Sequence, residues 1–292
     1  SNDIEELASK VEYEIDLVFD NLSEQSLVIL NEFSNSPFSI SQIKDNNYNK
    51  LCLRLNKYIR KMLPSNFRLA KIDNIISSIG VKKSFDMRYF YSSKSLYSAD
   101  FFKHYSDYVK PFIFSAAGKS KKALILDCDN TLWGGILGED GFDSIEMSEE
   151  TKNGNIFREI QNIILSLNKK GILLGICSKN NFDDVQAVID SHPDMQIRNE
   201  HITINKTNWN DKASNLMEIS EELNIGLDSI VFMDDSPFEV NLVKEALPDV
   251  KVLQRPDNLN EYPQMLRSNL DLFYTLSFTE EDKKKSEMYK SQ

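Results

Sequence analysis

The sequence predicts an α/β protein, with a central parallel β-sheet covered by helices and a smaller, mainly helical domain in front of it. Two observations support this fold class. Beyond residue 118, short apolar segments alternate with helical patterns, which is typical of parallel sheets. Before that point, apolar residues recur at the three- and four-residue steps of amphipathic helices. The small, basic segment 115–122 separates the two patterns, so we expect domains over 1–117 and 118–277, then a helical tail over 278–292 that would lead into a further domain.

The N-terminal domain is expected to be built from helices. One face of the first helix would be apolar, because five residues follow the helical spacing: Ile4, Leu7, Val11, Ile15 and Val18. A second helix is expected over 50–62. The aromatic-rich segment 85–114 leaves two uses open, stacking against nucleic-acid bases or packing against the neighbouring domain. The acidic charge of the chain favours the second use.

The C-terminal domain is expected to alternate strands and helices. The periodicity and the turn residues predict strands over 123–128, 172–177, 229–233 and 250–253, and helices over 156–170 and 213–224. The carboxyl ends of such strands lie at one edge of a parallel sheet, where α/β proteins place their functional sites. Polar residues directly after these strands are therefore the first candidates for a site.

Composition limits the partners that the chain can take. The 292 residues carry 34 Lys and Arg against 45 Asp and Glu, a formal net charge of -11, which disfavours binding to the phosphates of nucleic acid. The three cysteines are too few and too scattered for a disulfide framework or a zinc site. Apolar runs such as 171–177 stop well short of the roughly 20 residues that span a bilayer, and we expect no secretion leader. We expect a cytoplasmic protein with no nucleic-acid and no membrane partner.

The strongest chemical signal is the segment 124–131 (LILDCDNT), in which two aspartates directly follow an apolar strand. Asp127 and Asp129 are two residues apart, so pleat geometry would turn both toward the same ligand. One carboxylate could attack a phosphoryl group while the other carries the proton of the leaving group. Such crowding of like charges calls for a cation. A strand followed by an ordinary Asx turn is the alternative for this segment alone.

Three further segments add to this signal, each at the end of an expected strand or the start of an expected helix. Ser178 follows the second strand and offers a hydroxyl to an anion, and Lys212 opens a helix. Asp234 and Asp235 end the third strand, and paired carboxylates are hard oxygen ligands suited to Mg²⁺. Singly, Ser178 and Lys212 would be an ordinary turn residue and a surface lysine. Four such elements in this order are hard to explain by structural roles alone.

These motifs resemble those of the haloacid-dehalogenase (HAD) superfamily of phosphohydrolases and phosphotransferases, and the resemblance covers about residues 120–255. It implies a Rossmann-like core and a Mg²⁺-dependent phosphatase. Asp127 would be the nucleophile that forms an aspartyl-phosphate. Asp129 would be the general acid that protonates the leaving group and then the base that activates water.

The same resemblance implies a set of groups around the phosphate. Thr131 and Ser178 would bind the transferring phosphoryl group, and Lys212 would neutralise its charge as a further catalytic residue. The substrate would be a small phosphorylated molecule. Four residues would hold the Mg²⁺ ion, one of them through its backbone carbonyl and one through the water shell of the metal: Asp127, Asp129, Asp234 and Asp235.

Little sequence separates the first two motifs, which limits the cap that could cover the site. Once the helix over 156–170 is subtracted, the interval has no room for a large cap domain. The glycines of segment 133–141 (WGGILGEDG) suit a tight hairpin. We expect a minimal cap, a small hairpin flap over 133–147, and a relatively open site.

A finer resemblance is to the FkbH-like proteins of HAD subfamily IIIC. It is carried by segments 127–135 (DCDNTLWGG), 177–180 (CSKN) and 234–237 (DDSP). It implies an alternative function, a glyceryl transferase and phosphatase that loads a phosphoglycerate-derived acyl unit onto an acyl carrier protein. Cys177, beside the expected phosphate-binding serine, would carry that unit as a thioester. A buried structural cysteine is the plain alternative.

The three histidines lie outside these motifs. His104, His192 and His201 are far apart in the sequence, so we expect surface or turn positions rather than ligands or bases. The chemistry predicted above uses carboxylates, hydroxyls and an ammonium group instead.

Overall fold

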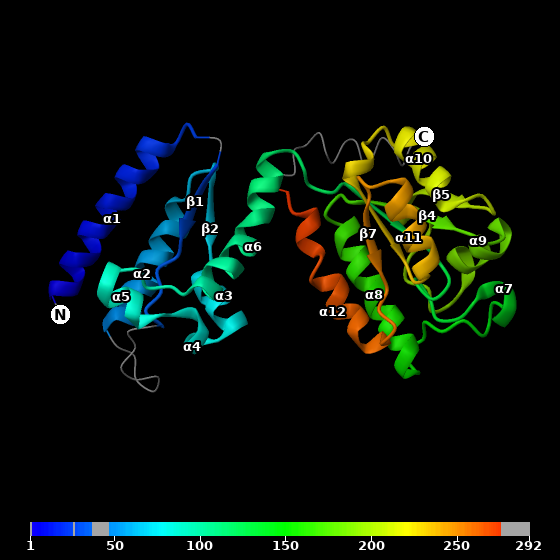
Figure 1. Ribbon diagram of the computed structural model, residues 1–292, viewed down its shortest axis with the longest axis horizontal. Coiled ribbons are helices and arrows are strands. Elements are labelled where there is room, and N and C mark those ends of the chain that lie inside the picture. Colours follow the sequence, from blue (N-terminus) through cyan, green and yellow to red (C-terminus); the bar gives the residue numbers. More distant parts are fainter. Residues whose placement is uncertain (1, 26, 37–46, 276–292) are drawn as a thin grey trace. The chain divides into compact units, whose positions relative to one another are not determined.

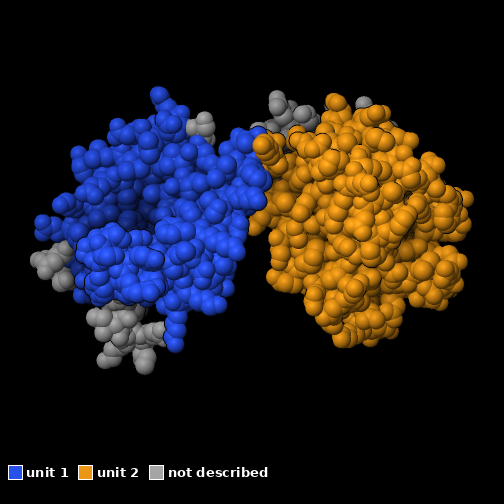
Figure 2. Space-filling model, in the orientation of Figure 1, with its two compact units in different colours: residues 1–117 blue, residues 118–292 orange. Residues whose placement is uncertain are grey.

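The computed structural model describes residues 2–25, 27–36 and 47–275 (Figure 1). The chain divides into two compact units, Ser1–Ala117 and Gly118–Gln292 (Figure 2). The tail expected over 278–292 lies outside the described residues. Among the residues described, no helix is both long enough and apolar enough to cross a bilayer.

The first unit is mainly helical, with one small sheet. Its strands β1 (Val28–Asn31) and β2 (Phe67–Ala70) pair in parallel. The helices are α1 (Asn2–Leu22), α2 (Asn47–Met62), α3 (Ile72–Ile79), α4 (Val81–Ser84), α5 (Met87–Ser93) and α6 (Ala99–Ala116). The sequence does not predict the sheet, because strands of four residues are too short to show a periodic pattern.

The buried face of α1 differs from the expected one. Ile15 and Phe19 lie in the core of the unit, where the Phe19 ring packs edge-on against Phe67 with 4.9 Å between the ring centres. Leu7 and Val18 are exposed by 43% and 39%, so the expectation was wrong for these two residues. The helix turns toward Phe19 because this large ring buries more apolar area than Leu7 or Val18 would.

The aromatic segment 85–114 packs largely inside its own unit. Phe85, Tyr97 and Phe101 make successive ring contacts beside the buried isoleucines of α3, with 3.9 Å between the ring centres of Tyr97 and Phe101. For these rings, packing against a neighbouring domain was therefore the wrong expectation. Their apolar area stabilises the first unit itself.

The second unit contains the predicted parallel sheet, in the strand order β5–β4–β3–β6–β7. Four of its strands correspond to the expected ones: β3 (Ala123–Leu126), β4 (Leu173–Ser178), β6 (Ile230–Asp234) and β7 (Lys251–Gln254). The edge strand β5 (Ile202–Thr207) is not predicted, because Asn205 and Lys206 interrupt its apolar pattern. The α/β fold class is confirmed.

Helices cover both faces of this sheet (Figure 1). Along β3, Leu124 and Leu126 belong to one hydrophobic cluster, and Ala123 and Ile125 belong to the other. The first cluster is closed by α8 (Lys152–Asn168), α9 (Phe182–Ser191) and α12 (Tyr262–Arg267), and the second by α10 (Lys212–Glu222) and α11 (Pro237–Ala246). Because β3 is buried on both faces, its polar residues come at the end of the strand, from Asp127 onward.

A small flap lies between β3 and α8. Gly134 and Glu146 form an antiparallel bridge with N···O distances of 2.9 and 2.8 Å, and one helical turn, α7 (Leu137–Asp140), lies between them. Gly134 has no space for a side chain, because a Cβ atom there would lie 2.8 Å from the ring of Phe157. The expected hairpin is thus reduced to one bridged pair around a short helix.

His192 occupies a turn, but it is not a surface residue. It directly follows α9 and is 4% exposed, so of the two expected kinds of position, surface or turn, it takes the second. Its Nδ1 accepts a hydrogen bond from the N–H of Asp194 at 3.2 Å. The ring also packs against Phe142 in the flap, with 4.9 Å between the ring centres, and so joins the flap to α9.

Candidate active site

The candidate site lies at the carboxyl edge of the second unit's sheet, where segments far apart in the sequence meet. Asp127 follows β3, Ser178 ends β4, and Asp234 ends β6. Lys212 is the first residue of α10, which follows β5. All four side chains are buried. The strand order brings them together, because β3 lies between β4 and β6.

Lys212 lies between two carboxylates. Its Nζ atom is 2.9 Å from Oδ1 of Asp127 and 2.5 Å from Oδ2 of Asp234. Burial opposes the charge of this ammonium group, but the two aspartates outweigh burial and raise the pKa of Lys212 above its ordinary value. The lysine is therefore held charged at the centre of the site.

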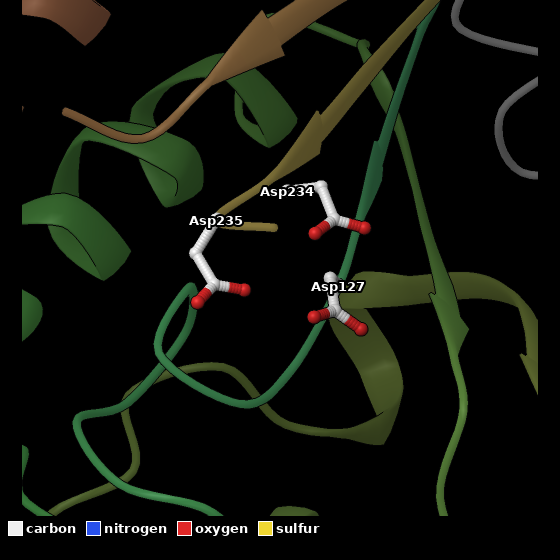
Figure 3. A group of neighbouring side chains, drawn as sticks. All are labelled: Asp127, Asp234 and Asp235. Carbon is white, nitrogen blue, oxygen red and sulfur yellow. The ribbon is translucent and has the colours of Figure 1, made fainter. Parts of the chain in front are cut away.

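Asp127, Asp234 and Asp235 form the one acidic cluster with metal-ligand spacing among the described residues, and an oxygen atom from each lies within 4.8 Å of the others (Figure 3). Burial raises the pKa of all three carboxyl groups, and their neighbours in the cluster add to the rise for Asp234 and Asp235. A divalent cation would compensate this crowding. Three converging carboxylates fit the hard oxygen ligands that Mg²⁺ prefers.

The carboxylate of Asp129 is outside this cluster and has three hydrogen-bond donors of its own. Its Oδ1 accepts from Trp133 Nε1 and from the backbone N–H of Leu137, each at 3.0 Å. Its Oδ2 accepts from Asn180 Nδ2 at 2.9 Å. Burial raises the pKa of Asp129, while these three bonds oppose the rise. Trp133 and Asn180 belong to motifs noted in the sequence, but nothing in the sequence assigns them to Asp129.

Ser178 and Thr131 differ in their relation to the nucleophile candidate. Burial raises the pKa of the Asp127 carboxyl, and the nearby Ser178 hydroxyl opposes that rise. Thr131 is completely buried, and its Oγ1 has no hydrogen-bond partner. Its backbone carbonyl accepts a hydrogen bond from Tyr262 Oη at 3.0 Å. Of the two residues, Ser178 is thus the one whose hydroxyl acts on the Asp127 carboxyl.

No family model and no curated protein matches the chain. The N-terminal part of the protein BF1531 from Bacteroides fragilis, described as containing a phosphatase domain and complexed with Mg, is 31% identical at a TM-score of 0.77. The match covers 94% of this chain and 74% of that one. The chain belongs to the HAD superfamily.

Two more distant HAD structures also match. A HAD family enzyme from Bacteroides thetaiotaomicron, solved with magnesium and inorganic phosphate, is 13% identical at a TM-score of 0.33, over 47% of this chain and 96% of that one. A HAD-superfamily hydrolase from Geobacter sulfurreducens is 14% identical at a TM-score of 0.31, over 50% of this chain and 96% of that one. Both similarities are too low to carry an argument.

Cys177 lies beside the candidate site in the sequence, but its thiol is directed into the core. The residue is 0% exposed and belongs to the hydrophobic cluster under α10 and α11. Its Sγ lies 3.9 Å from the backbone carbonyl oxygen of Lys212, and burial raises the pKa of the thiol to about 12. Cys128 is equally buried, in the cluster on the opposite face of the sheet.

Two ion pairs next to the candidate site were not predicted as pairs. Lys179 Nζ lies 2.7 Å from Oε1 of Glu239, whose other carboxylate oxygen is buried without a partner. Arg255 Nη2 lies 3.8 Å from Oδ2 of Asp235. Lys179 belongs to the noted motif after β4, whereas Arg255 follows β7, where the sequence gives no motif.

Proposed function

We propose that the protein is a Mg²⁺-dependent HAD-type phosphatase that acts on small phosphorylated molecules through an aspartyl-phosphate on Asp127. The observation that carries this proposal is the buried group at the end of β3 and β6. There Lys212 joins Asp127 to Asp234, and Asp235 completes the acidic cluster. A lysine and carboxylates that converge at one point are the groups that phosphoryl transfer needs, because the protein's task is to position the phosphate and neutralise its charge.

In the proposed reaction, a carboxylate oxygen of Asp127 attacks phosphorus, and the bond between phosphorus and the leaving oxygen breaks. Asp129 gives its proton to that oxygen. Asp129 then takes a proton from the water that hydrolyses the acyl phosphate, and inorganic phosphate is released. Ser178 and Lys212 hold the phosphoryl oxygens throughout, with Thr131 as a further proposed phosphate-binding residue.

The proposed cation would be held by four residues of this chain: Asp127, Asp234, Asp235 and, through its backbone carbonyl, Asp129. When bound, Mg²⁺ would supply positive charge against the phosphate oxygens. The charge of Lys212 acts on the same oxygens from the side of α10. The small flap leaves the mouth of the proposed site without a cap domain between β3 and α8, which suits substrates of varied size.

The finer alternative is the FkbH-like transferase, in which Cys177 would accept an acyl unit and pass it to an acyl carrier protein. Its support is the position of Cys177 directly before Ser178. Thioester formation requires an accessible thiolate, whereas Cys177 is fully buried and its pKa is raised to about 12. This environment favours simple phosphate hydrolysis, which is the function that we propose.

Hydrolysis of para-nitrophenyl phosphate tests the proposal. The parent protein should release phosphate in MgCl₂ and lose that activity in EDTA, and Asp127→Asn should lower kcat by roughly a thousandfold or more, because the nucleophile is removed. Full activity of Asp127→Asn would remove Asp127 as the nucleophile. Cys177→Ala should leave phosphate release intact under both functions, so the two are separated by whether the parent forms an acyl-enzyme on Cys177. An acyl-enzyme that is trapped in the parent and absent from Cys177→Ala would favour the transferase.

A further inference from the structure

The hydrogen bonds around Asp129 leave one of its oxygen atoms open. Two donors, Trp133 Nε1 and the N–H of Leu137, occupy Oδ1 at 3.0 Å each. One donor, Asn180 Nδ2, occupies Oδ2 at 2.9 Å. A carboxylate offers about two acceptor positions on each oxygen. The remaining position is therefore on Oδ2.

The donors to Asp129 are themselves held in place. Trp133 is completely buried in the hydrophobic cluster on its face of the sheet. Asn180 is 5% exposed, and its Oδ1 accepts from the N–H of Asn181 at 3.1 Å, which fixes the orientation of the amide. Leu137 begins α7 in the flap, and its side chain is buried. The carboxyl group cannot rotate without breaking bonds to groups that have little freedom to follow it.

We propose that Trp133 and Asn180 are positioning residues that keep Oδ2 of Asp129 as the atom through which the proton passes to the leaving oxygen. This inference rests on the proposed phosphatase function. As the bond between phosphorus and the leaving oxygen breaks and the bond to Asp127 forms, the proton moves from Oδ2 to the leaving oxygen. The charge left on Asp129 is then shared by the three donors, which require no rearrangement.

A purely structural role of the same bonds would have a different kinetic signature. If Trp133 and Asn180 only fasten the flap, their loss would affect every substrate alike. If they position Oδ2 of Asp129 for proton transfer, their loss should lower activity most for substrates whose leaving group must be protonated. A nitrophenolate leaves readily without a proton, whereas an alkoxide does not, and general acid catalysis contributes roughly a hundredfold or more where it is needed.

The test compares kcat/KM for para-nitrophenyl phosphate and benzyl phosphate in the parent, Trp133→Phe and Asn180→Ala. We expect each variant to lose about tenfold or more on benzyl phosphate and about twofold or less on para-nitrophenyl phosphate. Trp209→Phe is the matched control, because it removes an exposed indole whose N–H bonds to Asn181 and not to Asp129. It should leave both values unchanged.

Equal losses on the two substrates, or no loss on either, would overturn the positioning role. If the large buried Trp133 cannot be replaced without unfolding, Asn180→Ala tests the same point from the other oxygen. The proposed phosphatase function is tested separately by the same assays. If the parent turns over both substrates no faster than Asp127→Asn, that function is overturned.

Discussion

Lys212 and Lys206 each bridge two carboxylates, but in different surroundings. Lys212 and its partners Asp127 and Asp234 are all buried. Lys206 pairs with Glu218 and Glu222 at 2.8 and 2.6 Å, and the side chains of these two glutamates are about half exposed. Without Lys206, water can still solvate the charges of Glu218 and Glu222. Without Lys212, the buried charges of Asp127 and Asp234 would have no such compensation.

Replacing Lys212 by methionine should therefore lower the free energy of unfolding by about 3–5 kcal/mol, because two carboxylates remain buried without their shared cation. Methionine keeps the length and most of the apolar volume of the side chain. The measurement is urea unfolding at neutral pH in EDTA. Lys206→Met is the control and should cost about 1 kcal/mol or less. Equal losses in the two variants would contradict the central role that we assign to Lys212.

The positions of the site residues could be predicted where the residue ends or directly follows a strand. They were less predictable where contacts between distant segments determine them. Asp127, Ser178 and Asp234 follow or end buried strands, so their convergence follows from the parallel sheet. The hydrogen bond from Asn180 to Asp129 joins the loop after β4 to the loop after β3, and no local sequence pattern predicts it. The inward direction of the Cys177 thiol depends on the pleat of β4 and on the helix packed above it.

At the scale of the elements, long periodic segments were predictable and short ones were not. The helix expected over 156–170 is α8, Lys152–Asn168, and it begins earlier because Thr151 caps it through a bond to the N–H of Gly154. The four buried strands were found within two residues of their ends. β5 and the two strands of the first unit were missed, because they are short or interrupted by polar residues.

The buried His192, at the end of α9, should make the free energy of unfolding depend on pH. Burial lowers the pKa of this imidazole, which Asp143, Asp194 and Arg198 also influence. The unfolded chain, with an ordinary histidine pKa near 6.5, then binds the proton more readily than the folded chain. The free energy of unfolding should therefore fall as the pH drops from about 6.5 to the lower pKa that His192 has in the folded chain. The slope over this window should be at most about 1.4 kcal/mol per pH unit.

Urea unfolding of the parent and of His192→Gln between neutral and mildly acidic pH measures this effect. The glutamine variant should lose less stability over that interval, because it has no imidazole to protonate. Subtraction of the two profiles removes the contribution of the carboxyl groups that both proteins share. Substitution of the exposed His104 by glutamine is the control. Parallel profiles for the parent and His192→Gln would contradict the account.

At the scale of the whole molecule, the proposed chemistry belongs to one of the two units. The first unit has its own hydrophobic clusters, centred on residues such as Phe19 and Phe101, and the second has two clusters on either side of its sheet. Every residue to which we assign a step lies within Gly118–Gln292. The division into an N-terminal domain and a phosphatase core thus stays a prediction about folding as well as about function.

A protein consisting of residues 118–292 should fold cooperatively, because both hydrophobic clusters of the second unit are built from its own described residues. Its kcat/KM for para-nitrophenyl phosphate should stay within about threefold of the value for the full chain. Circular dichroism during urea unfolding and phosphate release are the two measurements. A folded but inactive fragment would show that the first unit contributes to catalysis, and an unfolded one that the units depend on each other for stability.

The most direct test of the central claim is to identify the covalent intermediate on Asp127. The parent and Asp127→Asn are mixed with para-nitrophenyl phosphate in MgCl₂, quenched in acid within the first turnovers, and digested for mass spectrometry. The account predicts an acyl phosphate on the peptide that contains Asp127, lost on treatment with hydroxylamine and absent from the variant. Turnover by the parent with no acyl phosphate, or with the phosphoryl group on another residue, would contradict it.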